Sequence, residues 1–347
     1  MVQAAPINEY LEVRSVVRTF VLICSLGLFV LASGASATQR PYVLEAERYH
    51  KLLMDMPFEL LELTVSEAAD LSETTSDGQP RAAAIIDGVT GCASAGCRFL
   101  KDELQWRETR TRLEAWNEAY PDSEAAQIAL ATLYYELGWF YRGTGPWKTV
   151  SQQNRDRYKQ FVELSREKLE ALPEESRNNP AWFGSLLSIG VSQNWDVATF
   201  DTIYDEGIEK FPDYLPLYFS KAQNVDPRWG GSMEGFIQYV DRASTYARPY
   251  FGDQLYARLI WSGPSSSLFR KNLVDWPRMR KGFNEMIAAH PHPWNINHFA
   301  RFACMARDSK TLVRLLERID EKPTFEAWYN DPMVYLNCQT FAMQSQT

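Results

Sequence analysis

Residues Asp196 to Asp213, DVATFDTIYDEGIEKFPD, indicate the fold more directly than any other stretch of the chain. Apolar residues recur in it every three or four positions, which is the period of a helix with one buried face. These residues are Val197, Phe200, Tyr204, Ile208 and Phe211. The phrase KFPD marks the end of the stretch, because proline lacks the backbone donor that a helix needs. The stretch therefore predicts an amphipathic helix from Asp196 to Phe211.

Helices of this kind are expected in pairs along the chain. The pairs are 121–141 with 154–172, 180–193 with 196–211, 214–225 with 233–247, 253–261 with 276–289, and 294–306 with 308–319. The prolines at 180, 212, 249 and 291 separate them at intervals of 32, 37 and 42 residues. This spacing is close to the 34 residues of a tetratricopeptide repeat. The sequence therefore predicts an all-α protein, an α-solenoid of about five tetratricopeptide-like helical hairpins.

The flanking segments have different compositions. Residues 1–37 have the order of a secretory signal peptide: Arg14 and Arg18, the apolar run Val21–Ala32, then small residues ending at Ala37. We expect cleavage after Ala37 and a periplasmic or secreted protein with no membrane span. The alternative is a retained anchor, although a span takes roughly 20 residues. Residues 38–98 are expected to form an N-terminal helix and loops, 99–322 the helical-repeat domain, and 323–347 a C-terminal capping tail.

Removal of the signal peptide leaves four cysteines, an even number that suits an oxidising compartment. We expect the disulfides Cys92–Cys97 and Cys304–Cys338. Glycines at 91 and 96 favour a tight loop that lets the first pair approach. The second pair would hold the tail over the last hairpin. The alternative is four reduced thiols, which would favour a cytoplasmic or membrane-anchored protein.

Four segments carry a resemblance to a known family. They are AYPDSEAAQIALATLYYELGWFYRGTG (119–145), DPRWGGS (226–232), LYARLIW (255–261) and NHFARFACMARD (297–308). Over roughly residues 85 to 330 the chain resembles an uncharacterised bacterial domain-of-unknown-function family with tetratricopeptide-like helical repeats. The resemblance implies the fold and no activity.

The segment DPRWGGS is the most unusual connection between two predicted helices. Its residues can all serve a corner: proline ends one helix, Gly230 and Gly231 turn the chain, Ser232 caps the next helix, and Trp229 fills the space between hairpins. The alternative is a binding site. The backbone N–H groups of Gly230, Gly231 and Ser232, beside Arg228, could hold an anion or carboxylate at a helix N-terminus.

Two other candidates for ligand binding are weaker. Arg142 lies in a second glycine-rich corner, YRGTGPW, which lacks the Lys-Ser/Thr ending of a phosphate-binding loop. Its glycines can equally end a helix. His298 lies within a predicted helix, where a buried or capping histidine is the simpler interpretation.

The composition and motifs argue against several classes of function. A formal charge of −8 argues against nucleic-acid binding. No nucleophile motif and no metal-ligand set is recognisable, so we expect no catalysis, no cofactor and no metal. We interpret the chain as an exported helical-repeat protein that binds a protein or peptide partner in the cell envelope. The alternative is a cell-wall glycan-binding protein or hydrolase that uses the two Arg/Gly-rich corners, since 11 Trp and 17 Tyr could stack on sugars.

Overall fold

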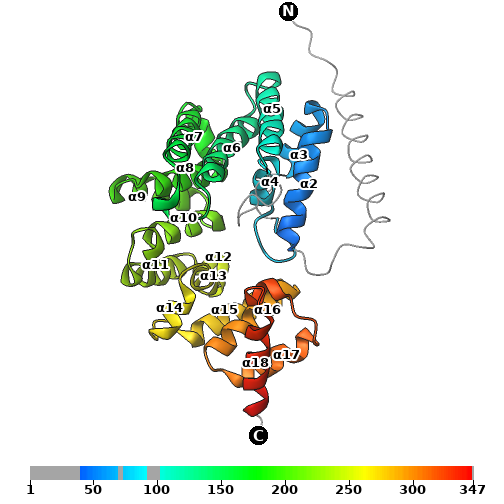
Figure 1. Cartoon of the computed structure of the whole chain (residues 1–347), viewed down its shortest axis with the longest axis vertical. Coiled ribbons are helices and arrows are strands. Elements are labelled where there is room, and N and C mark those ends of the chain that lie inside the picture. Colours follow the sequence, from blue (N-terminus) through cyan, green and yellow to red (C-terminus); the bar gives the residue numbers. More distant parts are fainter. Residues whose placement is uncertain (1–39, 69–72, 92–101, 346–347) are drawn as a thin grey trace, which may run out of the picture. The chain divides into compact units, whose positions relative to one another are not determined.

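A computed structural model describes residues 40–68, 73–91 and 102–345 of the chain. Within these residues there are 17 α-helices and four short 3-10 helices, and the only β-type pairing is an isolated bridge between Thr74 and Pro80. The all-α prediction is therefore confirmed (Figure 1). No helix in the described ranges combines the length and the apolar character needed to span a membrane. The expected signal peptide, residues 1–37, lies outside the described residues.

The five predicted helix pairs are all present. They are α6 (Glu124–Arg142) with α7 (Gln152–Glu170), α8 (Pro180–Gln193) with α9 (Val197–Lys210), α10 (Leu215–Val225) with α11 (Met233–Tyr246), α13 (Gln254–Ser262) with α15 (Trp276–Ala289), and α16 (Pro293–Met305) with α17 (Ser309–Ile319). The two helices of each pair pack against each other. In α9, Phe200 and Tyr204 are buried as predicted. Val197 is 68% exposed, so its place in the buried stripe was wrong; burial begins one turn later.

The first helices of the pairs also pack on one another along the chain. Helix α6 contacts α8, α8 contacts α10, and α10 contacts α13. Helix α16 joins them through the rings of Trp261 and His298, whose centroids are 3.9 Å apart. We call these five helices the first-helix row. Neighbour-on-neighbour packing of this kind agrees with stacked hairpins, and the solenoid itself stays a prediction.

Smaller elements surround the pairs. They are α2 (Pro41–Asp55), α3 (Phe58–Ala68), α4 (Arg81–Val89), α5 (Glu103–Ala119), α12 (Arg248–Phe251), α14 (Ser265–Arg270), α18 (Pro332–Gln344), and the 3-10 helices η1 (Trp147–Thr149), η2 (Glu174–Asn178), η3 (Pro227–Trp229) and η4 (Phe325–Trp328). Helices α4, α12 and α14 are too short to show a clear period in the sequence, and they were not predicted.

The N-terminal segment departs from simple stacking. The loop that precedes α4, at Thr75–Pro80, lies against α13 and α16, which are far away in the sequence (Figure 1). Arg258 of α13 donates to the carbonyl of Gly78 (2.9 Å), and Asn295 of α16 donates to that of Asp77 (3.2 Å). We call residues 73–80 the docked loop. Part of the first-helix row is thus already covered by the chain itself.

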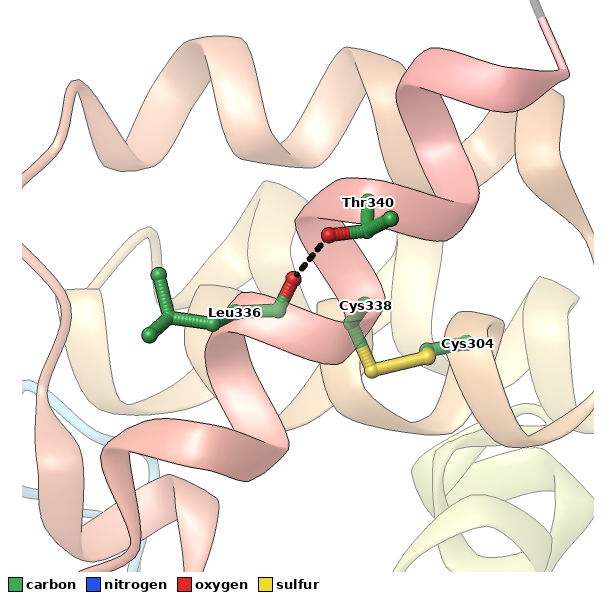
Figure 2. The surroundings of a disulfide bond; sticks show 4 residues. All are labelled: Cys304, Leu336, Cys338 and Thr340. Atoms are coloured by element: carbon green, nitrogen blue, oxygen red, sulfur yellow. Dashed lines mark hydrogen bonds between the residues drawn. A yellow bond between two sulfur atoms is a disulfide. The ribbon is translucent and has the colours of Figure 1, made fainter.

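The C-terminal tail, which was expected to cap the last hairpin, contains the helix α18. Figure 2 shows Cys338 of α18 joined to Cys304 of α16, which confirms this disulfide. Residues 92–101, which contain the other expected pair, Cys92–Cys97, lie outside the described residues. Helix α18 buries Tyr335, Cys338 and Ala342. Its opposite side exposes Met333, Leu336 and Met343, so its outer face is more apolar than that of a solvent-facing cap.

Candidate binding site

The DPRWGGS segment is organised around the buried carboxylate of Asp226, which is 1% exposed. Its oxygens accept hydrogen bonds from the backbone N–H of Arg228 (2.8 Å) and from the Arg228 guanidinium (2.6 to 3.1 Å). The same guanidinium donates to the carbonyl of Ser262 (3.0 Å) and so ties this corner to the end of α13. The charge of Arg228 is therefore already matched within the corner.

The glycines of the corner are required by the backbone. Gly230 has φ +99°, a left-handed conformation that side chains disfavour. A Cβ atom on Gly231 would lie 2.0 Å from the carbonyl oxygen of Val225. Ser232 caps α11 by accepting a hydrogen bond from the N–H of Gly235 (3.0 Å). The N–H groups of Trp229 and Gly231 both donate to the carbonyl of Asp226 (2.9 and 3.0 Å), so they point away from any external anion.

Trp229 reaches a different hairpin, as expected, but is not buried there. It remains 39% exposed, and its ring meets the edge of Trp139 with the centroids 5.6 Å apart. Its loss should cost less than that of a fully buried aromatic, because much of its surface stays in water. The guanidinium of Arg142 lies 5.2 Å from the centroid of the Trp139 ring and donates to the carbonyls of Gly143 and Gly145. The two Arg/Gly-rich corners thus meet at Trp139.

His298 lies apart from those corners, on α16. It is 4% exposed, and its ring is held between Trp261 (3.9 Å between centroids) and Trp294 (4.4 Å). Neither ring nitrogen has a hydrogen-bond partner within the described part of the chain. Burial lowers the pKa of His298 well below its ordinary value, and the positive charges of Arg301 and Arg40 lower it further. The imidazole is therefore neutral at pH 7.

A group of buried charges surrounds the docked loop. Asp77 is fully buried and accepts a hydrogen bond from the Thr75 hydroxyl (2.6 Å). Its other oxygen lies 3.6 Å from Nε of Arg40, whose guanidinium stands 4.8 Å above the Trp294 ring. Burial lowers the pKa of Arg258 to about 10, although the negative charge of Asp77 acts in the opposite direction. Positive charge predominates here, in a protein whose net charge is −8.

A second polar group lies between the N-terminal helices and the first-helix row. Tyr42 of α2 donates to a carboxylate oxygen of Asp87 in α4 (2.8 Å). Burial, and then the negative charge of Asp87, raise the pKa of Glu136 in α6 to about 8. Glu136 is therefore largely protonated at neutral pH.

The raised pKa of Glu136 predicts a pH-dependent stability. In the folded state Glu136 keeps its proton up to about pH 8, whereas in the unfolded chain it releases the proton near pH 4.5. The folded state is therefore stabilised below pH 4.5, and this stabilisation is lost as the pH rises to 8. Urea unfolding at pH 5 and pH 8 should show a larger fall for the wild type than for Glu136→Gln. The exposed control Glu118→Gln should behave like the wild type. Parallel pH profiles for wild type and Glu136→Gln would contradict the raised pKa.

The predicted site residues therefore fall into two groups. Arg142, Trp229 and the glycine corner gather near Trp139, whereas His298 belongs to the cluster of Arg40, Asp77, Arg258 and Asn295. Sequence reasoning missed this second group. A signal was present: LYARLIW and NHFARFAC each place an arginine within an otherwise apolar helical stretch.

No three His, Cys, Asp or Glu side chains of the described ranges gather as metal ligands would. Comparison of the sequence and structure with protein-family models, curated proteins and solved structures found no match.

Proposed function

We propose that the protein binds a protein or peptide partner in the cell envelope and holds an extended segment of that partner on the first-helix row. The observation that supports this is the docked loop, a segment of the chain's own that the row already holds. Arg258 and Asn295 donate to its main-chain carbonyls, and Arg40 lies beside the carboxylate of Asp77.

This mode of contact suits peptide recognition in general. A side chain that donates a hydrogen bond to a main-chain carbonyl recognises the backbone, which every peptide has. Such a contact places little restriction on the amino-acid sequence of the ligand. The buried positive charge beside it would favour a segment with an acidic side chain. The preferred partner is therefore an extended, acidic segment.

Export is part of the proposal. The Cys304–Cys338 disulfide is of the kind that persists outside the reducing cytoplasm. Together with the signal-like order of residues 14–37, it supports a periplasmic or secreted location. N-terminal sequencing of the protein from its host should begin at Thr38.

A peptide with the sequence of residues 73–81, ETTSDGQPR, tests the proposal. Asp77→Ala in the full chain removes the carboxylate that lies beside Arg40 and acts on Arg258, which weakens the hold on the docked loop, so the labelled peptide should bind this variant and saturate. The wild type should bind it at least about tenfold more weakly, because its own loop competes at an effective concentration near millimolar. The control Asp122→Ala, an exposed aspartate, should match the wild type. If the Asp77→Ala protein is folded but does not bind the peptide, the proposal that the first-helix row binds an extended segment is contradicted.

A second function is favoured by the meeting of the two corners. Trp147 and Trp229 are 40% and 39% exposed, and both belong to the aromatic cluster around Trp139 and Tyr158. Partly exposed indoles, in a cluster that Arg142 joins at Trp139, suit the stacking of a sugar ring. Peptidoglycan fragments should then quench tryptophan fluorescence in the wild type and less in Trp229→Ala. Equal quenching in both proteins would contradict glycan binding here.

A further inference from the structure

Helix α16 carries Trp294, His298 and Arg301 on one face, since they follow each other at four and three residues. All three contact aromatic rings or charged groups. Trp294 lies under the guanidinium of Arg40, and His298 is held between Trp294 and Trp261. Arg301 continues this face toward η4.

Arg301 is buried without a matching negative charge. The residue is 4% exposed, and its Nε has no hydrogen-bond partner in residues 40–68, 73–91 and 102–345. Its guanidinium instead lies near two rings, 4.7 Å from the centroid of Phe302 and 4.1 Å from that of Tyr329. Ring contacts compensate only partly for the lost hydration of a cation.

The neighbouring groups do not supply the missing charge. The guanidinium groups of Arg40 and Arg301 are both close enough to His298 to lower its pKa. The charged groups that act on the imidazole are therefore positive. The carboxylate of Asp77 lies beside Arg40 and acts on Arg258. Within the described ranges, Asp77 thus serves Arg40 and Arg258, and no ion pair reaches Arg301. A buried charge without a counter-charge is unfavourable, and a bound anion would supply that counter-charge.

We propose that Arg301 and His298 bind an oxyanion, the carboxylate or phosphate group of a small ligand, beneath the ring of Tyr329. The guanidinium of Arg301 would donate to the anion oxygens, and His298 would donate once the anion's charge favours its protonated form. Tyr329 is 55% exposed and forms the outer cover of the guanidinium, so movement of this ring gives access. Its φ of +62° and that of Asn330, +55°, place two successive residues in the left-handed region at this point.

The test is titration of the full-length protein with inorganic phosphate and, separately, acetate, with chloride at equal ionic strength as the reference. The two anions distinguish a phosphate-bearing from a carboxylate-bearing ligand. One of them should raise the melting temperature and should also raise the pKa of His298, followed by NMR of its ring. Arg301→Gln should weaken that binding by at least about tenfold, the effect of losing a hydrogen bond to a charged group. Arg318→Gln, on the exposed side of α17, is the matched control.

If Arg301→Gln does not fold, a second pair of variants tests the oxyanion site. Tyr329→Ala removes only an exposed ring, and it should weaken binding about threefold because water then screens the guanidinium. Tyr250→Ala, at a tyrosine 53% exposed on α12, should leave the affinity unchanged. The proposal is overturned if neither anion stabilises the wild type beyond chloride, or if Tyr329→Ala binds as the wild type does. Because the titration uses no peptide, its result is independent of the proposed partner-binding function.

Discussion

Asn297→Leu is expected to lower the free energy of unfolding by about 2 to 6 kcal/mol, because it leaves two buried donors without an acceptor at about 1 to 3 kcal/mol each. The Asn297 side chain is 1% exposed, and its oxygen accepts from the indole N–H of Trp328 (2.8 Å) and the backbone N–H of Thr324 (3.1 Å). Its amide nitrogen donates back to the carbonyl of Pro293 (2.9 Å). This one side chain therefore fixes η4 on α16.

Urea denaturation of the oxidised protein measures the loss. The matched control is Asn337→Leu, which makes the same change at an exposed position of α18 and should alter stability by less than about 0.5 kcal/mol. Equal stabilities for the two variants would mean that water or a shifted η4 satisfies the donors. Trp328 fluorescence would then show whether η4 has moved.

Gly282→Ala and Gly184→Ala are expected to change stability in opposite directions. A Cβ atom on Gly282 of α15 would lie 2.1 Å from the carbonyl oxygen of Asp253, so α15 and α13 would have to separate. Such overpacking costs about 1 to 3 kcal/mol, and more where the obstacle is backbone. On Gly184 of α8 the nearest atom would be a Tyr214 ring carbon at 3.9 Å, an ordinary contact. Alanine there should stabilise the helix by about 0.5 to 1 kcal/mol.

The two glycine variants serve as controls for each other, since both change glycine to alanine within a helix. Thermal and chemical unfolding should place the wild type between them. If Gly282→Ala were as stable as the wild type, α13 and α15 would pack less closely than the distance to Asp253 indicates.

The hairpins could be predicted because they are local features. A period of 3.6 residues, a proline and a capping serine each act within about one turn of a helix, so they can be read without knowledge of the rest of the chain. Ser123 shows this: a serine at the start of a helical stretch is a preferred cap, and its hydroxyl accepts from the N–H of Ala126 (3.1 Å). Val197 shows the limit, since a position on the apolar stripe is buried only where a neighbouring helix covers it.

The candidate site depends on contacts that are remote in sequence. Whether Arg142, Arg228 and His298 lie together could not be predicted, because residue type does not reveal which residues meet. Arg228 proved to be matched by Asp226, two positions away, whereas Arg301 has no such partner in the described chain. A single sequence can show that a charged residue lies on an apolar helix face. It does not show which group that residue contacts.

The docked loop has a consequence for the synthesis of this protein. Gly78 and Arg258 are 180 residues apart, and Asp77 and Asn295 are 218 apart. A plain stack of hairpins can be completed as each one emerges, since each needs only its neighbour. In this chain, by contrast, the docked loop cannot form its contacts until α13 and α16 have been synthesised. Closing such long loops is slow, so nascent chains should spend time with Asp77 and its surroundings unpaired.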